Sequence, residues 1–414
     1  MHRSGKIIAI LVIVIIIAAG SFVAGMFFQS RFNTPAFASS AITGFAFGND
    51  APGQPISDDE SLPEIQTFWE AWSFLEEQFY GDIPSDNERI YGAIRGMVES
   101  FDDQHTAFID PVRAAVSSEN ISGSFEGIGA SIRLDDTGRL VIAHPFPDRP
   151  AFEAGLHPDD VILEIDGQSV EGLNLYEAVL QIRGPAGSTV TLTIFREGEP
   201  EPFEVPIVRA EIEIEVVQAE LLENNIGYVR LTQFSKGAAD KITTAINDLV
   251  DQGATSLIFD LRSNPGGLLS ESVNVGSIFL DEGAIVIERL KDGEEKLFNV
   301  KRGQQVATDV PLVVLVNGGS ASASEIVAGA IQDLERGALI GEPTFGKGSV
   351  QLPHTLSDGS QLRVTIAEWL TPARRQIHGQ GIVPDITVEM TLEDFEQGVD
   401  PQLDKAIEFL SDPQ

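Results

Sequence analysis

The amino-acid sequence predicts an α/β fold with several parts. These are a large core with a parallel-type sheet and helices, an inserted β-rich domain, an N-terminal helical segment and a single transmembrane helix. Three observations support this. Toward the C-terminus, strand-like runs alternate with helical segments, an order typical of parallel sheets. Residues 124–209 instead contain short alternating strands punctuated by glycine and proline. Residues 7–28 form an uncharged apolar run long enough to cross a bilayer.

The N-terminal apolar run predicts a membrane anchor. Arg3 and Lys6 precede it and an acidic chain follows, so the positive-inside rule keeps the N-terminus in the cytoplasm and places the remainder outside. The alternative is a cleaved signal peptide, because Ala36-Phe37-Ala38 resembles a small-residue cleavage site. We favour an uncleaved anchor, since the run is long and that site lies far beyond its end. Both interpretations place most of the chain outside the cytoplasm.

The segments after the anchor follow in a clear order. Residues 31–60 have the composition of a linker, and residues 61–115 carry apolar residues at helical spacing. The β-rich domain is expected at 116–209 and the core at 210–414. Core strands are expected at 226–231, 256–261 and 312–316, core helices at 238–251, 268–280, 323–334 and 401–410, and a hairpin turn at 357–360.

The composition excludes several classes of function. The 414 residues include 27 Lys and Arg against 63 Asp and Glu, a formal net charge of −36. Nucleic-acid affinity comes mostly from Lys and Arg that neutralise phosphates, so we expect no nucleic-acid partner. The chain has no cysteine, which excludes disulfides, thiolate metal ligands and cysteine nucleophiles. Any chemistry must therefore use oxygen or nitrogen groups.

Residues 312–336 predict a strand, a glycine-rich turn and a helix. Ser320, Ser322 and Ser324 fall at the start of this helix, where unpaired backbone N–H groups and the helix dipole favour negative charge. A serine in this position is a candidate nucleophile. The alternative is that these serines cap the helix, a role for which serine is strongly preferred.

A second motif, GEPTFGKGS, spans residues 341–349. It is close to the phosphate-binding pattern G-x-x-x-x-G-K-[ST], but Gly348 replaces the hydroxyl residue that would bind magnesium. We therefore do not expect a nucleotide site. Lys347 is then either an exposed loop lysine or the base of a serine nucleophile, as in Ser–Lys variants of the catalytic triad.

A lysine is the expected base because no histidine stands in an obvious triad context. The histidines considered are His105, His144, His157, His354 and His378. A neutral lysine has to be packed among apolar groups and hydrogen-bonded by a neutral partner. Phe345 and Val350 are expected to supply the apolar packing, and Gln351 the hydrogen bond.

Four long segments occur in a specific order: DLRSNPGG at 260–267, NGGSASASEIVAGAIQD at 317–333, GEPTFGKGSVQ at 341–351 and GQGIVPDITVE at 379–389. Together they closely resemble the carboxyl-terminal processing peptidases, or tail-specific proteases. The resemblance runs from about residue 62 to the C-terminus. It implies a serine-type peptidase with a crotonase- or Clp-protease-like core, in a bacterial cell membrane, with the catalytic part outside the cytoplasm.

The resemblance also implies roles for individual residues. The implied nucleophile, general base and lysine-orienting residue are Ser322, Lys347 and Gln351. The implied oxyanion hole consists of the backbone N–H groups of Ala323 and of either Gly266 or Gly267. Each such donor contributes roughly 3 kcal/mol to lowering the barrier. Asp333 matches an acid of the motif, and we expect its role to be structural.

Two further segments, FEGIGA at 125–130 and PAFEAGLHPDDVILEIDGQSV at 150–170, make the β-rich domain resemble a PDZ domain. PDZ domains bind a chain terminus as an added strand while loop N–H groups hold its carboxylate. Asp159 stands where the family usually has glycine, a change that a left-handed turn tolerates. Arg183 aligns with a basic position that senses peptide, with a surface ion pair as the alternative. The implied peptide-binding residues are Gly127, Ile128, Gly129, Ala130 and Arg183.

The sequence thus predicts a membrane-anchored serine endopeptidase. It is expected to recognise nonpolar C-terminal tails of exported proteins through the PDZ domain and to cleave by a Ser–Lys mechanism that requires no metal or cofactor. The alternatives are a PDZ scaffold with an inactive protease domain and a histidine-based serine hydrolase. The helices near 62–101 and the C-terminal helix are the expected surfaces of a possible homodimer.

Overall fold

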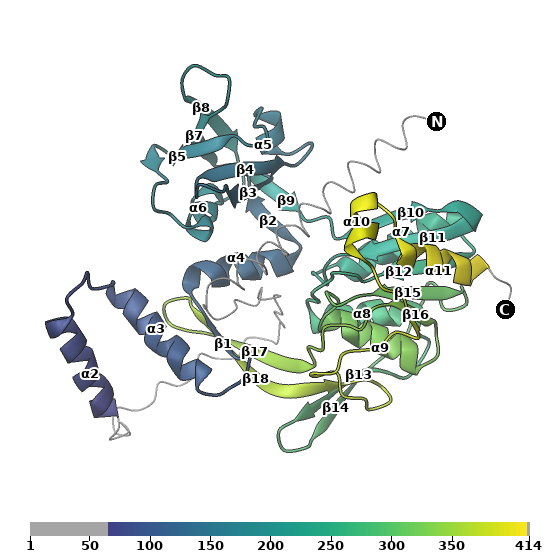
Figure 1. Ribbon diagram of the computed structural model, residues 1–414. Coiled ribbons are helices and arrows are strands. Elements are labelled where there is room, and N and C mark those ends of the chain that lie inside the picture. Colours follow the sequence, from purple (N-terminus) through teal and green to yellow (C-terminus); the bar gives the residue numbers. More distant parts are fainter. Residues whose placement is uncertain (1–64, 412–414) are drawn as a thin grey trace.

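The computed structural model describes residues 65–411 (Figure 1). Its central element is a six-stranded sheet in the order β10-β11-β12-β15-β16-β19. The strands from β11 to β19 run parallel, and β10 pairs antiparallel along one edge. This confirms the predicted parallel-type sheet. Its strands are β10 (Val217–Leu221), β11 (Ile226–Leu231), β12 (Ser256–Asp260), β15 (Leu312–Val316), β16 (Ala338–Gly341) and β19 (Ile386–Thr387).

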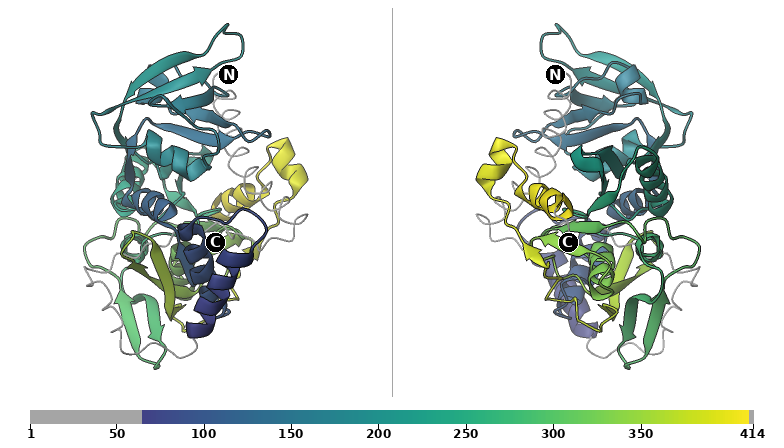
Figure 2. Two further views of the ribbon diagram at one scale, coloured as in Figure 1. Left: turned by 90° about the vertical axis from the view of Figure 1, so that its left-hand side faces the viewer. Right: turned by 90° about the vertical axis from the view of Figure 1, so that its right-hand side faces the viewer.

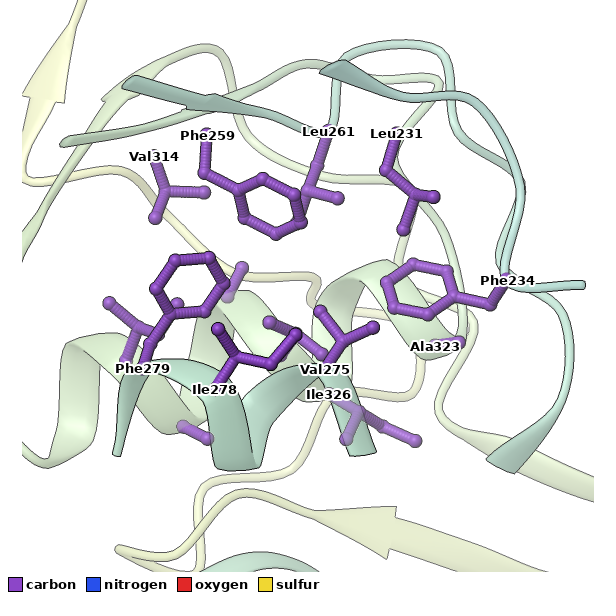
Figure 3. Packing of buried hydrophobic residues seen from close by; sticks show 14 of the residues in the cluster. Leu231, Phe234, Phe259, Leu261, Val275, Ile278, Phe279, Val314, Ala323 and Ile326 are labelled. Atoms are coloured by element: carbon purple, nitrogen blue, oxygen red, sulfur yellow. The ribbon is translucent and has the colours of Figure 1, made fainter. Parts of the chain in front are cut away.

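Helices cover both faces of this sheet, because successive strand residues point to opposite faces and nearly all of them are apolar. Phe259 and Val314 face α8 (Leu269–Phe279) and α9 (Ala323–Asp333) (Figure 3). Helix α7 (Ala238–Asp251) packs on β10 and β11 in the same cluster. Their neighbours Ile258 and Val313 belong to a second cluster with α11 (Pro401–Ser411). A short helix, α10 (Leu392–Gln397), precedes α11. The first cluster forms the main core and fixes the start of α9.

A second, antiparallel sheet lies beside the core and was only partly predicted. Strands β17 (Ser349–Thr355) and β18 (Gln361–Leu370) form a hairpin, which confirms the turn expected at 357–360. β18 also pairs with β1 (Ala107–Ile109) and with β13 (Ala284–Leu290), which in turn pairs with β14 (Glu295–Asn299). β1 is a strand inside residues 61–115, which were predicted to form a helical domain, and its pairing with β18 brings the N-terminal region against the core.

A small domain stands at one end of the molecule (Figure 2). Its sheet has the order β3-β4-β5-β7-β8, with β6 paired to β5. A core of its own includes Ile142, Leu192 and Ile194. Two paired strands, β2 (Ser124–Gly127) and β9 (Ala210–Glu213), carry the chain into and out of this domain. Its other elements are β3 (Ala130–Leu134), β4 (Leu140–Pro145), α5 (Pro150–Glu153), β5 (Val161–Ile165), β6 (Gln168–Ser169), α6 (Leu175–Ile182), β7 (Thr189–Phe195) and β8 (Phe203–Val208).

The described N-terminal part consists of α2 (Ile65–Gln78), α3 (Asp86–Glu99) and α4 (Pro111–Ser122), in agreement with the predicted helical spacing. Ser85 and Glu88 form a capping box that explains where α3 begins. Helix α4 packs against both α6 and β2 of the small domain (Figure 1). No helix within residues 65–411 is long and apolar enough to cross a membrane. The predicted anchor at 7–28 and linker at 31–60 lie outside the described residues.

Candidate active site

Ser322 lies at the turn between β15 and α9, as the sequence predicted. Its backbone adopts φ 55° and ψ −112°, a conformation that a serine rarely takes and that only a tightly constrained turn maintains. The side chain is 1% exposed. Because α9 begins at Ala323, the backbone N–H groups of its first turn, which have no intrahelical acceptor, lie next to Ser322.

Hydrogen bonds distinguish Ser322 from the two neighbouring serines. The Ser320 hydroxyl donates to the carbonyl of Leu261 at 2.8 Å, and the Ser324 hydroxyl donates to the carbonyl of Asn264 at 2.9 Å. Both therefore attach the start of α9 to the loop after β12. The Oγ of Ser322 is buried and has no hydrogen-bond partner. Of the three serines, only Ser322 has a hydroxyl that holds no structural contact.

The carboxylate of Glu325 joins the two motifs that carry the predicted nucleophile and base. A single oxygen, Oε2, accepts the backbone N–H of Ser322 at 2.8 Å and that of Lys347 at 2.9 Å. The other oxygen accepts the N–H of Gly346 and the hydroxyl of Thr344, each at 2.6 Å. Burial raises the pKa of Glu325, whereas these hydrogen bonds act in the opposite direction. No sequence pattern predicts this role, because Thr344, Gly346 and Lys347 lie about twenty residues after Glu325.

Lys347 is buried at 8% exposure, which excludes the exposed-loop alternative. Burial, and after it the positive charge of Arg363, lower the pKa of Lys347 from 10.5 to about 8, while Glu325 opposes them. The two flanking glycines permit close packing, since a side-chain carbon on Gly348 would lie 2.2 Å from the backbone nitrogen of His378. Val350 is buried as expected, but Phe345 is 59% exposed and does not supply the predicted apolar packing.

Gln351 is buried near the start of β17. Its Nε2 donates to Ser349 Oγ at 2.8 Å and to Thr365 Oγ1 at 3.3 Å, which fixes the amide plane. Its Oε1 is buried without a hydrogen-bond partner, so in this structure it does not accept from Lys347. The structure thus holds the glutamine in place and leaves its acceptor oxygen unused.

The loop after β12 brings Gly266, one of the two predicted oxyanion-hole glycines, next to the nucleophile. A side-chain carbon on Gly266 would lie 2.8 Å from the Ala321 carbonyl oxygen and 2.9 Å from the Ala323 nitrogen, so only glycine fits. The N–H of Gly266 donates to Asn264 Oδ1 at 2.9 Å and is therefore already committed. Gly267 and the N–H of Ala323 are the two members of the predicted set that remain for an oxyanion.

Two histidines lie close to the predicted base. The rings of His105 and His378 meet edge to face, with centroids 5.6 Å apart. Burial, followed by the charge of Lys347, lowers the pKa of His105. His105 precedes β1, and His378 lies in the loop that packs on Gly346 and Gly348. Because the two histidines are far apart in the sequence, no sequence pattern indicates that they lie side by side.

Asp333 has a structural role, as expected. Its carboxylate accepts the N–H of Ala373 at 2.7 Å and pairs with Arg375 at 2.5 Å. Both partners follow β18, and Asp333 ends α9, at the opposite end of the helix from Ser322. It ties the second sheet to the helix and does not approach the nucleophile.

The predicted carboxylate-binding loop lies where the small domain meets the rest of the protein. Strand β3 faces α6 across the site where PDZ domains add a peptide strand. The guanidinium of Arg183 lies 4.5 Å from the centre of the Phe125 ring and packs beside Gly127. Asp159 adopts φ 67°, the left-handed turn expected of it. Ile128 and Gly129 accept the N–H groups of Ala151 and Phe146 through their carbonyls, which fixes the loop.

The phosphate-binding interpretation of residues 341–349 is excluded, because the N–H groups of Gly346 and Lys347 donate to a carboxylate and not to open space. Within residues 65–411, no group of three His, Asp or Glu side chains is placed to hold a metal ion.

Comparison with known proteins agrees with this arrangement. Family models match residues 225–388 to Peptidase family S41 and residues 119–195 to the PDZ domain. The carboxy-terminal processing protease CtpA of Bacillus subtilis is 37% identical over 356 residues, covering 86% of this chain and 75% of that protein. The carboxy-terminal-processing protease of Bartonella bacilliformis is 40% identical over 352 residues, covering 84% and 80%. Among solved structures, a photosystem II D1 C-terminal processing protease is 32% identical, with a TM-score of 0.46 and coverage of 79% and 88%.

An α/β core with a serine at the start of a helix, joined to a PDZ domain, defines a serine-type peptidase. More narrowly, the chain belongs to the carboxy-terminal processing proteases of peptidase family S41.

Proposed function

We propose that this protein is an endopeptidase that cleaves by a Ser–Lys mechanism, with Ser322 as nucleophile and Lys347 as general base. One observation carries the proposal: Glu325 Oε2 accepts the backbone N–H groups of both residues, which holds the two motifs together. The unpartnered Ser322 hydroxyl and a lysine whose pKa is lowered to about 8 supply the two chemical requirements, a nucleophile and a base that loses its proton near neutral pH.

In the proposed reaction, Lys347 Nζ takes the proton of Ser322 Oγ while the oxygen attacks the scissile carbonyl. The N–H groups of Ala323 and Gly267 stabilise the oxyanion. Lys347 then gives its proton to the leaving amine, and water hydrolyses the acyl-enzyme with Lys347 again as base. Gln351 Oε1 has no partner in this structure. We propose that it accepts a hydrogen bond from Lys347 Nζ once the substrate is bound and so orients the amine toward Ser322.

The substrates we propose are exported proteins with nonpolar C-terminal tails. The tail adds as a strand beside β3, and loop residues 127–130 hold its carboxylate, with Arg183 beside the loop. Ser322 and Lys347 are both buried, so a polypeptide reaches them only after part of the structure moves. We expect the PDZ domain to control this access.

The decisive experiment measures cleavage of an unfolded reporter protein with varied C-terminal residues. Wild type is expected to cleave reporters with apolar ends, and Ser322→Ala and Lys347→Ala are expected to lose turnover. The rate should rise toward alkaline pH with one apparent ionisation near 8. Undiminished turnover by either variant, or a rate that is constant from pH 6 to 10, would exclude the Ser–Lys mechanism.

A histidine base is the competing mechanism, because His105 and His378 lie near Lys347. It predicts that Lys347→Ala retains activity while His378→Ala or His105→Ala loses it. Exposed His354 serves as the control, since its replacement is expected to have no effect under either mechanism. A scaffold with an inactive protease domain predicts peptide binding without Ser322-dependent cleavage.

The full chain is proposed to be a single-pass protein of the bacterial cell membrane, with the protease outside the cytoplasm.

We also propose a homodimer through α2 and α3, because Trp69 and Phe74 expose large apolar side chains and no residue of α2 is buried. Light scattering should give a dimer mass for wild type and a monomer mass for Trp69→Ser/Phe74→Ser. A monomeric wild type would exclude this interface.

A further inference from the structure

Arg363 on β18 is a buried cation with no acidic partner. Its side chain is 6% exposed, and its Nε has no hydrogen-bond partner. Within residues 65–411, no carboxylate forms an ion pair with it, and burial alone lowers its pKa. An arginine is costly to bury without a compensating charge. Arg363 therefore calls for an explanation that packing does not provide.

The register of the second sheet places Arg363 on the side that holds the lysine-orienting glutamine. Thr365, two residues along β18, pairs with Gln351 and accepts its amide hydrogen bond. Residues two apart on a strand point to the same face, so Arg363 and Thr365 share that face. The charge of Arg363 accordingly acts on Lys347 in the direction that favours the neutral amine.

The groups that face Lys347 come from several elements. Glu325 on α9 favours the protonated amine, whereas Arg363 on β18 disfavours it. His105 from the segment before β1 interacts with Lys347, and His378 contacts His105. Arg363 is the only arginine in this set, whereas burial and the charge of Lys347 lower the pKa of His105 and so favour its neutral form.

Arg363 is also attached to helix α4. Its Nη2 donates to the Ser117 hydroxyl at 2.8 Å, and both side chains are buried. On the same helix, the Arg113 guanidinium lies 5.2 Å from the centre of the Tyr176 ring at the start of α6. Helix α4 therefore contacts the helix that borders the peptide site and the arginine beside the base.

We propose that Arg363 is a positioning residue, a positively charged neighbour of Lys347. Through its hydrogen bond to Ser117, helix α4 transmits peptide binding from the PDZ domain to the base. This inference rests on the proposed Ser–Lys function and adds a route of regulation to it. A shift of α4 on peptide binding moves the guanidinium and so changes the pH at which the enzyme becomes active.

The test compares pH–rate profiles of the full-length protein on the unfolded reporter. Arg363→Met is expected to raise the apparent ionisation by at least about half a pH unit, which lowers the rate at pH 7 about threefold and leaves the rate at pH 10 near wild type. Arg363→Lys restores the profile. Arg336→Met is the matched control, because burial lowers the pKa of Arg336 as it does that of Arg363, but Arg336 donates to backbone carbonyls beyond the far end of α9. An unchanged profile for Arg363→Met overturns the proposal.

Two further measurements complete the test. The first examines the link to α4, and the second separates an effect of Arg363 on Lys347 from a failure of the proposed catalytic mechanism. A non-cleavable peptide with an apolar C-terminus should shift the apparent ionisation of wild type but not of Ser117→Ala, and an equal shift in both overturns the link. NMR titration of isotopically labelled Lys347 in Ser322→Ala, with and without Arg363→Met or Arg363→Lys, reads the lysine without turnover. If wild type lacks Ser322-dependent cleavage, the proposed function fails, and this titration still decides whether Arg363 acts on Lys347.

Discussion

Replacing Lys347 with methionine is expected to make the folded protein more stable at pH 7 while abolishing catalysis. The folded-state pKa of about 8 lies below the ordinary value of 10.5. The unfolded state therefore binds more protons between these values, and stability rises with pH in this range. Below pH 8, the lowered pKa of Lys347 reduces the free energy of unfolding by its full amount, about 3 kcal/mol at 1.36 kcal/mol per pH unit. At pH 9.5 this loss of stability is only about 1 kcal/mol.

The assay is denaturant unfolding at pH 7 and pH 9.5 in a Ser322→Ala background, which prevents self-digestion. Buried Trp369 reports unfolding of the protease core by fluorescence. Lys347→Met should raise the free energy of unfolding by about 3 kcal/mol at pH 7 and by clearly less at pH 9.5. Lys291→Met, in the exposed turn between β13 and β14, should change it by less than about 0.5 kcal/mol at both pH values. The reasoning would be refuted if Lys347→Met raised the free energy of unfolding equally at both pH values, or lowered it.

The remaining predictions concern residues that hold the site together. Glu325→Gln should lower kcat about 100-fold or more with little change in KM, since it weakens the shared acceptor of both motifs; a change confined to KM would contradict this. Gly266→Ala should abolish activity, whereas Gly138→Ala, which also has positive φ but open space around it, should not; equal losses would assign the effect to backbone strain instead of crowding. Asp333→Asn should lower the melting temperature and leave the pH–rate profile unchanged, and a shifted profile would show that Asp333 acts on the base.

Much of this site could be predicted because its key residues lie in short contiguous motifs. The strand–turn–helix pattern around Ser322 is visible in the periodicity of apolar residues, and the structure shows α9 starting at Ala323. Two glycines around Lys347 indicated tight packing, and the loop containing His378 provides it. In both cases, neighbouring residues in the sequence were sufficient to predict the local structure of the site.

Other features depend on contacts between distant segments, which one sequence does not encode visibly. Ser320 and Ser324 differ from Ser322 only through bonds to a loop some sixty residues earlier. The bond between Arg363 and Ser117 spans 246 residues. Phe345 was wrongly expected to pack inward, because a loop sequence does not reveal which side chains face solvent. Only the hairpin of the second sheet was predicted, because the rest of its order depends on β1 and β13 pairing with β18.

The paired strands β2 and β9 make the PDZ domain an exchangeable attachment. Because Gly127 pairs with Ala210 across this ribbon, the two points where the chain enters and leaves the domain are as close as neighbouring strands, about 5 Å. A protease core whose two ends are already side by side requires only a tight turn to close after removal of the domain. The same geometry accepts a different binding module with adjacent termini, so the choice of substrate can change while the catalytic core is kept.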